Sequence, residues 1–390
     1  MFDGGGIWNV LSFILLIIFF FFLPKLMVYQ IISLLNSKVL EYEGYIANAR
    51  KEIFRKIRKK TSLSKKQMEE KFGSILEFFV VEPSSIDPFG IAKKINFVTR
   101  MYDKKMLHLT KTLAPGLKEA EVKDVSASLT HTIGLYQIVK ALKHYIQIIK
   151  ETNNFQIGMI IQMQLPFLDK QVKALYKSIP AFIHKIPVGD SIAPLFASKL
   201  IGNGKCFEIA EDTVCCKKEL YGKNCFIVKA KGPEANLGNI KEAVERLMKK
   251  YKIEKVITID AAGGKESEKT GEVAYGVGFA MGDRGAERYL IEDLLMKKGI
   301  PIEAIAIKMK PEEALMPMKK EILDSIPKIE KYLEEILKSS KEKNILIYCA
   351  GVTIGVGNTE KDFEKAVKKI KENLRREKRM ESRKRISWIR

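Results

Sequence analysis

The spacing of hydrophobic residues changes twice along this chain. From Ile7 to Leu23 no residue is charged, and Ile, Leu and Phe dominate. Between Glu41 and Lys177 the apolar residues mostly recur at intervals of three and four, which is typical of amphipathic α-helices. From about Pro180 onward, short β-rich runs alternate with glycines and helical patterns, as in a parallel sheet with crossover helices. The pattern therefore predicts an apolar N-terminal segment, a helical domain and an α/β domain.

The apolar segment predicts a retained transmembrane helix. Its uncharged part would be about 26 Å long as a helix, and apolar character resumes after Pro24 and Lys25 as far as Leu35. A tilted helix of that length could cross a bilayer. The sequence has neither the basic start nor the small-residue cleavage site of a signal peptide, so we expect the segment to be kept.

Basic residues gather only after this segment and include a cluster from Arg50 to Lys60. This asymmetry predicts a single-pass protein of the cell membrane, with its soluble bulk facing the cytoplasm. Residues 7–35 would contact the membrane. The basic cluster would either touch anionic lipid headgroups or form a solvated helix face.

Helix-breaking segments divide the helical region into about five helices of a bundle. They are Glu82–Pro88, Ala114–Gly116 and Thr152–Asn154. The expected organisation is an anchor at residues 1–36, a helical domain at 37–180, an α/β domain at 181–374 and a basic tail at 375–390.

The α/β region contains four candidate strands with helical patterns between and after them. The strands are Cys225–Lys229, Val256–Asp260, Ile302–Ile307 and Ile345–Cys349. The helices are Asn239–Tyr251, Arg284–Lys298, Pro317–Leu337 and Glu360–Leu374. This alternation predicts a three-layer α/β domain with a mostly parallel sheet.

Charge narrows the classes of partner. The 390 residues include 68 Lys and Arg against 47 Asp and Glu, a net charge of +21, which favours anionic lipid, nucleic acid or an acidic protein or peptide. The tail from Arg375 to Arg385 has seven basic and two acidic residues but no interleaved aromatic side chains. The sequence therefore argues against specific RNA recognition without excluding nucleic acid.

Metal and cofactor signals are weak. The cysteines at 206, 215, 216 and 225 lack the short paired spacing of a zinc site, and we expect reduced thiols, with a disulfide or a metal as the alternative. The histidines at 108, 131 and 144 are dispersed, which favours packing or surface roles. We expect no metal site and no cofactor.

Two carboxylates are candidates for chemistry, because ligands of open parallel sheets bind outside the carboxyl ends of the strands. Asp190 and Ser191 lie in a polar turn that opens a helix, where capping alone could explain them. Asp260 ends a buried strand, where a structural hydrogen-bonding role is the alternative. The flexible loop after it offers Gly263, Gly264 and Lys265 as ligand contacts.

Two glycine-rich stretches are further candidates. Gly276 and Gly278 could bring the backbone close to a bound chain, or could be ordinary bulges. Gly351, Gly355 and Gly357 follow a strand and could expose amides to an anion. Their spacing fits neither a Walker A motif nor a dinucleotide fingerprint, so phosphate or nucleotide binding is the third hypothesis for function.

The whole chain resembles an archaeal family of unknown function, the domain-of-unknown-function family 1512. The resemblance rests on the apolar N-terminus, the segment from Phe79 to Gly90 and the segment from Pro187 to Ile192. It implies no activity.

Residues 187 to about 308 also resemble the fold shared by hydrogenase maturation endopeptidases and the spore germination protease. Asp190 and Asp260 fall on that fold's early Asp-containing turn and later strand-end Asp. The resemblance implies peptide hydrolysis by two carboxylates with divided acid and base roles. Ala193 replaces a glycine of the motif, and no histidine follows His184, so the metal ligand of the maturation peptidases has no counterpart.

The leading hypothesis is therefore a membrane-anchored protein with a hydrolase-like, peptidase-like α/β domain that uses Asp190 and Asp260. The main alternative is a noncatalytic membrane scaffold whose α/β domain senses a ligand.

Overall fold

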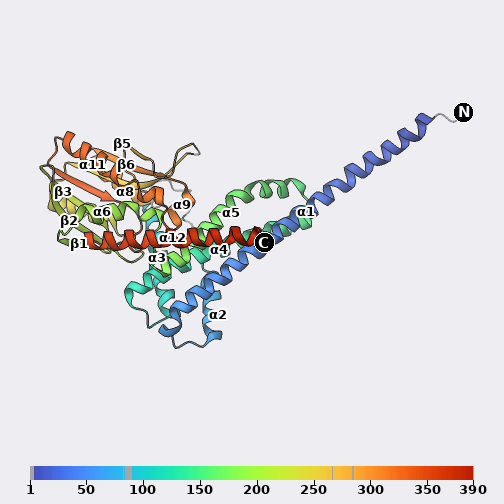
Figure 1. Ribbon diagram of the computed structural model, residues 1–390, viewed down its shortest axis with the longest axis horizontal. Helices are drawn as coiled ribbons and strands as arrows, with labels where there is room; N and C mark the ends of the chain where they lie inside the picture. Colours follow the sequence, from blue (N-terminus) through green and yellow to red (C-terminus); the bar gives the residue numbers. More distant parts are fainter. Residues whose placement is uncertain (1–3, 82, 84–89, 266, 283–284, 390) are drawn as a thin grey trace.

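A computed structural model describes residues 4–81, 83, 90–265, 267–282 and 285–389. The first part of the chain is helical (Figure 1). Its helices are α1 (Gly4–Ile57), η1 (Arg58–Lys60), α2 (Lys65–Leu76), α3 (Ile91–Leu113), α4 (Glu119–Thr152) and α5 (Phe155–Ile183). We call this part the helical domain. Its core lies where α1, α4 and α5 pack together, around fully buried side chains such as Leu35, Leu129 and Val172.

Two of the three predicted helix breaks are confirmed. α3 ends before Ala114, whose amide bonds to the carbonyl of Thr110, and α4 ends before Asn153, which adopts a left-handed conformation with φ of 48°. The third predicted break, Glu82–Pro88, lies outside the described residues except for Pro83.

The prediction of an N-terminal transmembrane anchor is wrong. In the described part of the chain, no helix has both the length and the apolar character needed to span a membrane. The uncharged run holds 17 residues, whereas a span needs about 20. Beyond Lys25, the apolar residues that were expected to lengthen the span are partly used by the protein core, since Val28, Ile31 and Leu35 are buried. The prediction of a single-pass membrane localisation, which depended on this anchor, is therefore wrong as well.

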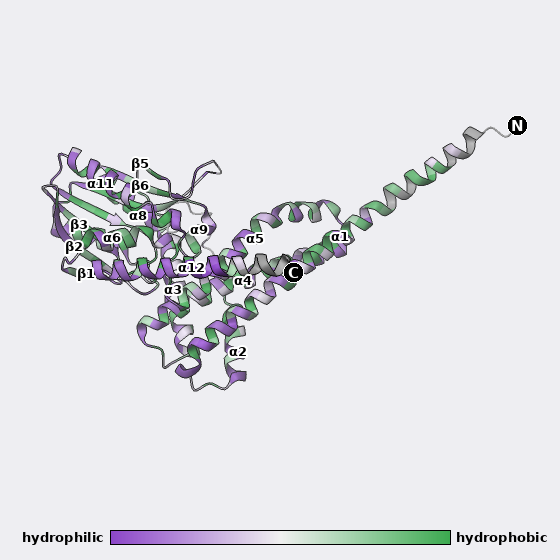
Figure 2. Ribbon diagram, viewed as in Figure 1, coloured by the Kyte–Doolittle hydropathy of each residue, from purple (hydrophilic) through white to green (hydrophobic). Residues whose placement is uncertain are grey.

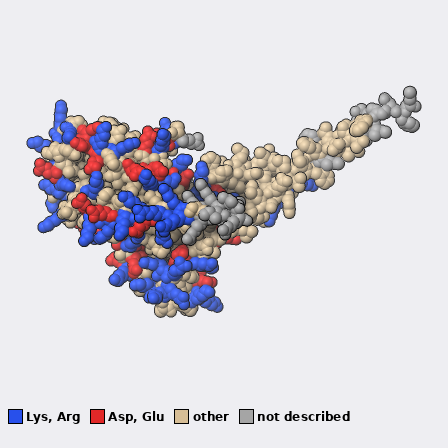
Figure 3. All heavy atoms as spheres, in the orientation of Figure 1, with Lys and Arg blue, Asp and Glu red and all other residues tan. Residues whose placement is uncertain are grey.

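The outer part of α1 extends away from the other helices, with the N-terminus at its far end (Figure 1). Trp8, Phe13 and Phe22 are exposed there, and the hydropathy colouring shows the apolar character of this part (Figure 2). Lys and Arg side chains instead gather over the α/β domain and the lower part of the helical domain in this view, interspersed with Asp and Glu (Figure 3).

The second part of the chain, which we call the α/β domain, is built on a seven-stranded sheet. The strand order is β1-β2-β3-β7-β4-β6-β5. The strands are β1 (Cys206–Ala210), β2 (Thr213–Leu220), β3 (Lys223–Ala230), β4 (Lys255–Gly263), β5 (Val273–Val277), β6 (Ile302–Met309) and β7 (Asn344–Cys349). The four strands predicted from the sequence correspond to β3, β4, β6 and β7.

Helices cover both faces of this sheet. They are η2 (Gly189–Ser191), α6 (Ile192–Ile201), α7 (Ile240–Lys250), α8 (Gly285–Lys297), α9 (Pro311–Leu315), α10 (Lys320–Leu323), α11 (Ile326–Ser339) and α12 (Glu360–Ile389). One apolar cluster joins the sheet to α6, α11 and α12, and another joins it to α7 and α8. The residues predicted as a basic tail continue α12 as far as Ile389.

The prediction of a mostly parallel sheet is wrong, because the sheet is mixed. The central strands β3, β7, β4 and β6 are parallel to one another. The outer strands β1, β2 and β5 pair antiparallel with their neighbours. The turns at Glu211–Asp212 and Tyr221–Gly222 hold two residues each, and such short turns can join only antiparallel strands. Asp212, Tyr221 and Gly222 have positive φ, as tight hairpin turns require.

The cysteines also differ in part from expectation. Cys206 and Cys216 face each other across β1 and β2 and form a disulfide. Cys215, Cys225 and Cys349 are buried free thiols. The expected reduced state is therefore wrong for one pair.

Candidate functional site

The carboxyl ends of β3, β7, β4 and β6 meet at one edge of the sheet, since these strands are parallel neighbours. The loops that follow β3 and β7 interlock there. The Thr353 amide donates to the carbonyl of Asn236 at 3.0 Å, and the Thr353 hydroxyl donates to the carbonyl of Glu234 at 2.8 Å. The Gly355 amide donates to the carbonyl of Pro233 at 2.9 Å. The two loops therefore form one rigid rim.

A buried lysine holds this rim to the sheet. Lys229, near the end of β3, is fully buried, and its Nζ donates to the carbonyls of Ala230 and Gly357 and to Oδ1 of Asn358 at 2.8–3.0 Å. Burial lowers the pKa of Lys229 to about 7, whereas the three acceptors favour the protonated form.

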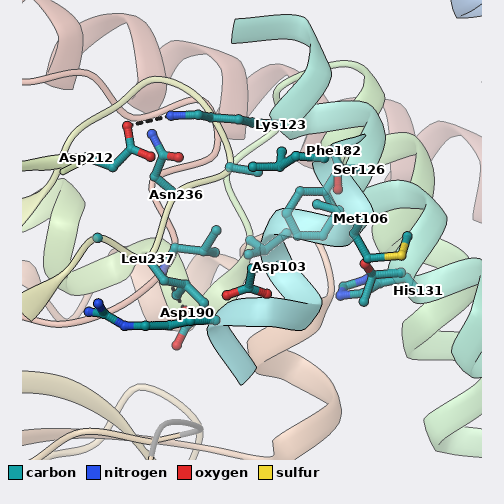
Figure 4. Close-up of a pocket in the computed structure, with 18 of the residues that line it drawn as sticks. Asp103, Met106, Lys123, Ser126, His131, Phe182, Asp190, Asp212, Asn236 and Leu237 are labelled. Carbon is teal, nitrogen blue, oxygen red and sulfur yellow. Dashed lines mark hydrogen bonds and ion pairs between the residues drawn. The ribbon is translucent and has the colours of Figure 1, made fainter. Parts of the chain in front are cut away.

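A cavity of about 340 Å³ lies between this rim and the helical domain. Its walls come from both domains (Figure 4). The helical domain contributes residues of α3 between 100 and 107, residues of α4 between 123 and 131, and Phe182 of α5. The α/β domain contributes Val188, Asp190, Glu211, Asp212, residues 235–239, Ala314, Leu315 and Val352. The cavity thus sits at the sheet edge where open α/β proteins bind ligands.

Asp190 is held firmly in the cavity wall. Its turn packs against α9 so closely that a Cβ on Gly189 would lie 2.2 Å from the carbonyl oxygen of Glu313. Oδ2 of Asp190 accepts a hydrogen bond from the amide of Val352 at 2.7 Å. A Cβ on Gly351 would lie 2.1 Å from the backbone oxygen of Asp190, so only glycine fits there. Asp190 is therefore fixed to the rim by its neighbours.

Charged groups of both signs line the cavity. Lys123 of α4 forms an ion pair with Asp212 of the β1–β2 turn, and this pair crosses the domain boundary (Figure 4). Arg100 of α3 donates to Oδ1 of Asn239 across the same boundary. Asp103 and Lys104 belong to the lining as well.

His131 adds a neutral imidazole to the wall. The hydroxyl of Ser178 donates its single hydrogen to the carbonyl of Leu175 at 2.7 Å, so it accepts from Nδ1–H of His131. Burial lowers the pKa of His131 to about 4, which keeps the ring neutral near pH 7. Nε2 is then an acceptor. The ring also packs edge-on against Phe182, with 4.9 Å between ring centroids.

Beside the cavity, a buried carboxylate joins the two domains. Asp124 of α4 accepts from the amide of Ala235 at 2.9 Å and lies 3.2 Å from Nζ of Lys185. Lys185 in turn lies 3.4 Å from Glu234. Burial raises the pKa of Asp124 to about 6, although Lys185 opposes the shift.

The two predicted catalytic residues have different surroundings. Asp190 lines the cavity, whereas Asp260 is buried and is not among the described residues of the lining. Oδ1 and Oδ2 of Asp260 accept from the amides of Ala261 and Gly282, both at 2.7 Å. The catalytic role of Asp260 and its structural alternative both stay predictions. The hydroxyl of Ser191, next to Asp190, is buried and has no hydrogen-bond partner among the described residues.

The glycines predicted to contact a ligand also differ in their distance from the cavity. Gly351 contacts Asp190, but the amides around it are used inside the protein. Those of Val352, Thr353, Gly355 and Val356 donate to the side chain of Asp190 or to backbone carbonyls. Anion binding by these amides stays a prediction that their geometry does not favour. Gly263, Gly264, Lys265, Gly276, Gly278, Gly355 and Gly357 are not among the described residues that line the cavity.

Sequence reasoning missed the helical side of the cavity. Arg100, Asp103 and Lys104 share one face of α3, because residues three and four apart are neighbours on a helix. That spacing was visible, but nothing local showed that this face would meet the sheet edge. Within the described residues, no group of three or more His, Cys, Asp or Glu is arranged to hold a metal ion.

Comparison with known protein families decides the identity of the chain. Residues 9–185 match the N-terminal domain of a protein family of unknown function, DUF1512, and residues 188–360 match its C-terminal domain. The chain belongs to the DUF1512 family. The two DUF1512 domains meet at residues 186–187, between α5 and η2, so the cavity lies between them.

Comparison with curated proteins and with solved structures identifies no further relative. No curated protein and no solved structure matches the chain significantly. The archaeal source and the resemblance to maturation endopeptidases stay predictions.

Proposed function

We propose that this DUF1512 protein binds a small molecule in the cavity between its two domains and acts as a ligand-sensing module. The supporting observation is that both domains build the cavity at the carboxyl edge of the parallel strands. Ligands of open α/β sheets bind at this edge. The volume, about 340 Å³, is within the range of small-molecule sites.

Sensing follows from the position of the cavity. The contacts that join the domains surround it: Lys123 with Asp212, Arg100 with Asn239, and Asp124 with the amide of Ala235. A ligand that touches both walls adds contacts only when the domains are docked. By linkage, its binding energy stabilises the docked arrangement relative to any opened one.

The test is thermal unfolding of the full chain with a panel of metabolites. A ligand present at about 100 times its Kd adds about 2.7 kcal/mol to stability, which is a measurable rise in Tm. Leu237→Trp places a bulky ring in the cavity lining and is expected to abolish that rise. Leu40→Trp adds the same bulk at an exposed position on α1 and is expected to leave it unchanged. Equal shifts in both variants would contradict the proposal.

Hydrolysis is a second candidate function, and the observation that favours it is the position of Asp190 in the cavity wall. If the protein cleaves peptides, Asp190→Asn should lower the rate on a peptide library by about 100-fold or more, as expected for a general acid or base. Asp260→Asn tests the two-acid form of this proposal. Loss of cleavage with Asp190→Asn alone would leave one catalytic carboxylate, and no cleavage by the wild type would remove the candidate.

A further inference from the structure

We propose that the Cys206–Cys216 disulfide is a redox switch for the junction between the two domains, opened and closed by thiol–disulfide exchange with a dithiol. This inference goes beyond the proposed function, because it needs no ligand. Two observations carry it. The bond closes a ring of residues around the β1–β2 turn, and that ring holds contacts that join the domains beside the cavity.

The disulfide closes the open end of a short hairpin. Cys206 begins β1, and Cys216 lies in β2 ten residues later, with the turn at residues 211–212 between them. β1 is the outermost strand of the sheet, so β2 is its neighbour on one side. A cross-link removes conformations from the opened hairpin and leaves the paired hairpin intact. The bond therefore favours the closed hairpin.

Two routes of contact lead from this ring to the helical domain. Asp212, in the turn, forms the ion pair with Lys123 of α4 (Figure 4). Thr213 follows the turn, and its hydroxyl oxygen accepts from the amide of Asn239 at 2.7 Å. The side chain of Asn239 in turn accepts from Arg100 of α3. Opening of the hairpin would therefore disturb both junction contacts, together with the cavity wall to which Asp212 belongs.

The hairpin has further supports, so reduction should loosen it without unfolding it. Nη1 of Arg246 donates to the carbonyl of Ile209 at 2.9 Å, and Glu208 lies 2.6 Å from Nζ of Lys231. Ile209 and Ala210 are buried in the apolar cluster that contains α7. These contacts keep β1 near its place when the bond is broken. The two sulfur atoms can then meet again, which makes the switch reversible.

The two sulfur atoms differ in accessibility. Cys206 is partly exposed, whereas Cys216 is 1% exposed. The thiolate of a dithiol reductant therefore attacks Sγ of Cys206, so that a bond forms between these sulfurs and the Cys206–Cys216 bond breaks. Cys216 leaves as a thiolate and takes a proton. The second thiol of the reductant then attacks the mixed disulfide. Cys206 is released as a thiol, the reductant becomes a cyclic disulfide, and two electrons and two protons have passed to the protein.

The remaining cysteines should not take part. Cys215, Cys225 and Cys349 are fully buried free thiols. Burial raises the pKa of Cys215 and Cys349 to about 12 and the pKa of Cys225 to about 11. A cysteine is nucleophilic as a thiolate, so these three react slowly at neutral pH. Exchange is therefore confined to the Cys206–Cys216 pair.

The first test is modification of the native full chain by iodoacetamide, before and after treatment with dithiothreitol. Mass spectrometry of peptides locates the modified cysteine. We expect Cys206 to be modified only after treatment, because the disulfide protects it until it is reduced. If Cys206 stays unmodified after treatment, the disulfide is out of reach of a dithiol and the proposal is overturned.

The second test is hydrogen–deuterium exchange of the oxidised and the reduced chain. In the reduced chain, exchange should be at least 10-fold faster at residues 206–216 and also faster in the loop at residues 235–239. Exchange in β7, in the middle of the sheet, should be unchanged. Faster exchange confined to residues 206–216 would show that the disulfide holds the hairpin alone. Faster exchange everywhere, β7 included, would show that it holds the whole fold. Either result would overturn the switch.

Variants separate the disulfide from the contacts that its ring carries. Cys206→Ser should exchange like the reduced chain and should not respond to dithiothreitol, which controls for other effects of the reductant. Lys123→Gln and Asp212→Asn, alone and together, measure the coupling free energy of the ion pair by urea denaturation. This coupling should be at least twice as large in the oxidised chain as in the reduced one. A general loss of stability shifts all four proteins alike, so equal coupling in both states would contradict the proposal.

Discussion

The two halves of the sheet's carboxyl edge carry an aspartate each but are covered differently. At the β3–β7 half, the helical domain closes over interlocked loops and leaves a cavity whose wall includes Asp190. At the β4–β6 half, Asp260 is buried and bonded to two backbone amides, and the following Gly263 is exposed with open space around it. The same residue type at the same edge therefore lines a cavity in one half and is buried against backbone amides in the other.

The difference teaches that the surroundings of a carboxylate at this edge depend on which segments lie over it. Asp190 meets α3 and α4 across a space that water or a ligand can fill. Asp260 accepts hydrogen bonds from the backbone amides of Ala261 and Gly282. Experiments that disturb one half and spare the other can break or sharpen this comparison.

The largest expected effect comes from adding one methyl group to a glycine of each half. Gly351→Ala places a Cβ 2.1 Å from the Asp190 carbonyl oxygen, at a φ of 125° that other residues rarely adopt. We expect the free energy of unfolding to fall by about 3 kcal/mol. Gly263→Ala meets no atom within 4 Å and should change it by less than about 0.5 kcal/mol. Urea denaturation measures the free energy of unfolding of both variants. An equal loss in Gly351→Ala and Gly263→Ala would show that the covered half is not the more tightly packed one.

The next effect concerns the pH dependence of the domain junction. The folded state keeps the Asp124 proton up to about pH 6, whereas the unfolded chain loses it near the ordinary value of 3.8. The folded state therefore binds more protons in this window, and stability should fall as pH rises from about 4 to 6. A shift of this size corresponds to about 3 kcal/mol at most.

Asp124→Asn should flatten this dependence, because the amide cannot ionise. Asp324→Asn, at an exposed site, should leave it as in the wild type. Urea denaturation at several pH values between 4 and 7 measures the slopes. A wild-type stability that rises steadily through this window, with the same slope in Asp124→Asn, would contradict the assignment of a raised pKa.

The smallest effect separates the two aspartates directly. Asp260→Asn weakens two charge-assisted bonds to backbone amides, so it should lower the free energy of unfolding by about 1–2 kcal/mol and leave ligand affinity unchanged. Asp190→Asn should lower ligand affinity instead, by about 10-fold. Titration calorimetry and urea denaturation of the same two variants give both numbers. A loss of affinity in Asp260→Asn would mean that both halves serve one site.

Much of this edge was predictable from local sequence. A buried apolar run that ends in Asp260 predicts a strand-end carboxylate, and the turn before Ile192 predicts Asp190 at a helix start, because strand and helix patterns are local. The helix breaks at Ala114 and Asn153 are local as well. These positions are where the sequence predictions hold.

The remainder depended on contacts between distant segments. Arg100 and Asn239, which meet at the cavity, are 139 residues apart in the chain. Nothing in either local pattern indicates that they meet. The apolar residues after Lys25 show the same limit, because Val28, Ile31 and Leu35 would look alike in sequence whether they faced lipid or the protein core. Strands β1, β2 and β5 were missed, and their antiparallel pairing made the sheet mixed.

Hydrogen–deuterium exchange of the full chain, with and without the metabolite that raises Tm most, tests the central claim most directly. The account predicts slower exchange in the loop at residues 231–239 and in α3, with no change in the loop after β4 at residues 263–272. Protection confined to the loop after β4, or to segments away from the cavity, would contradict binding between the two domains.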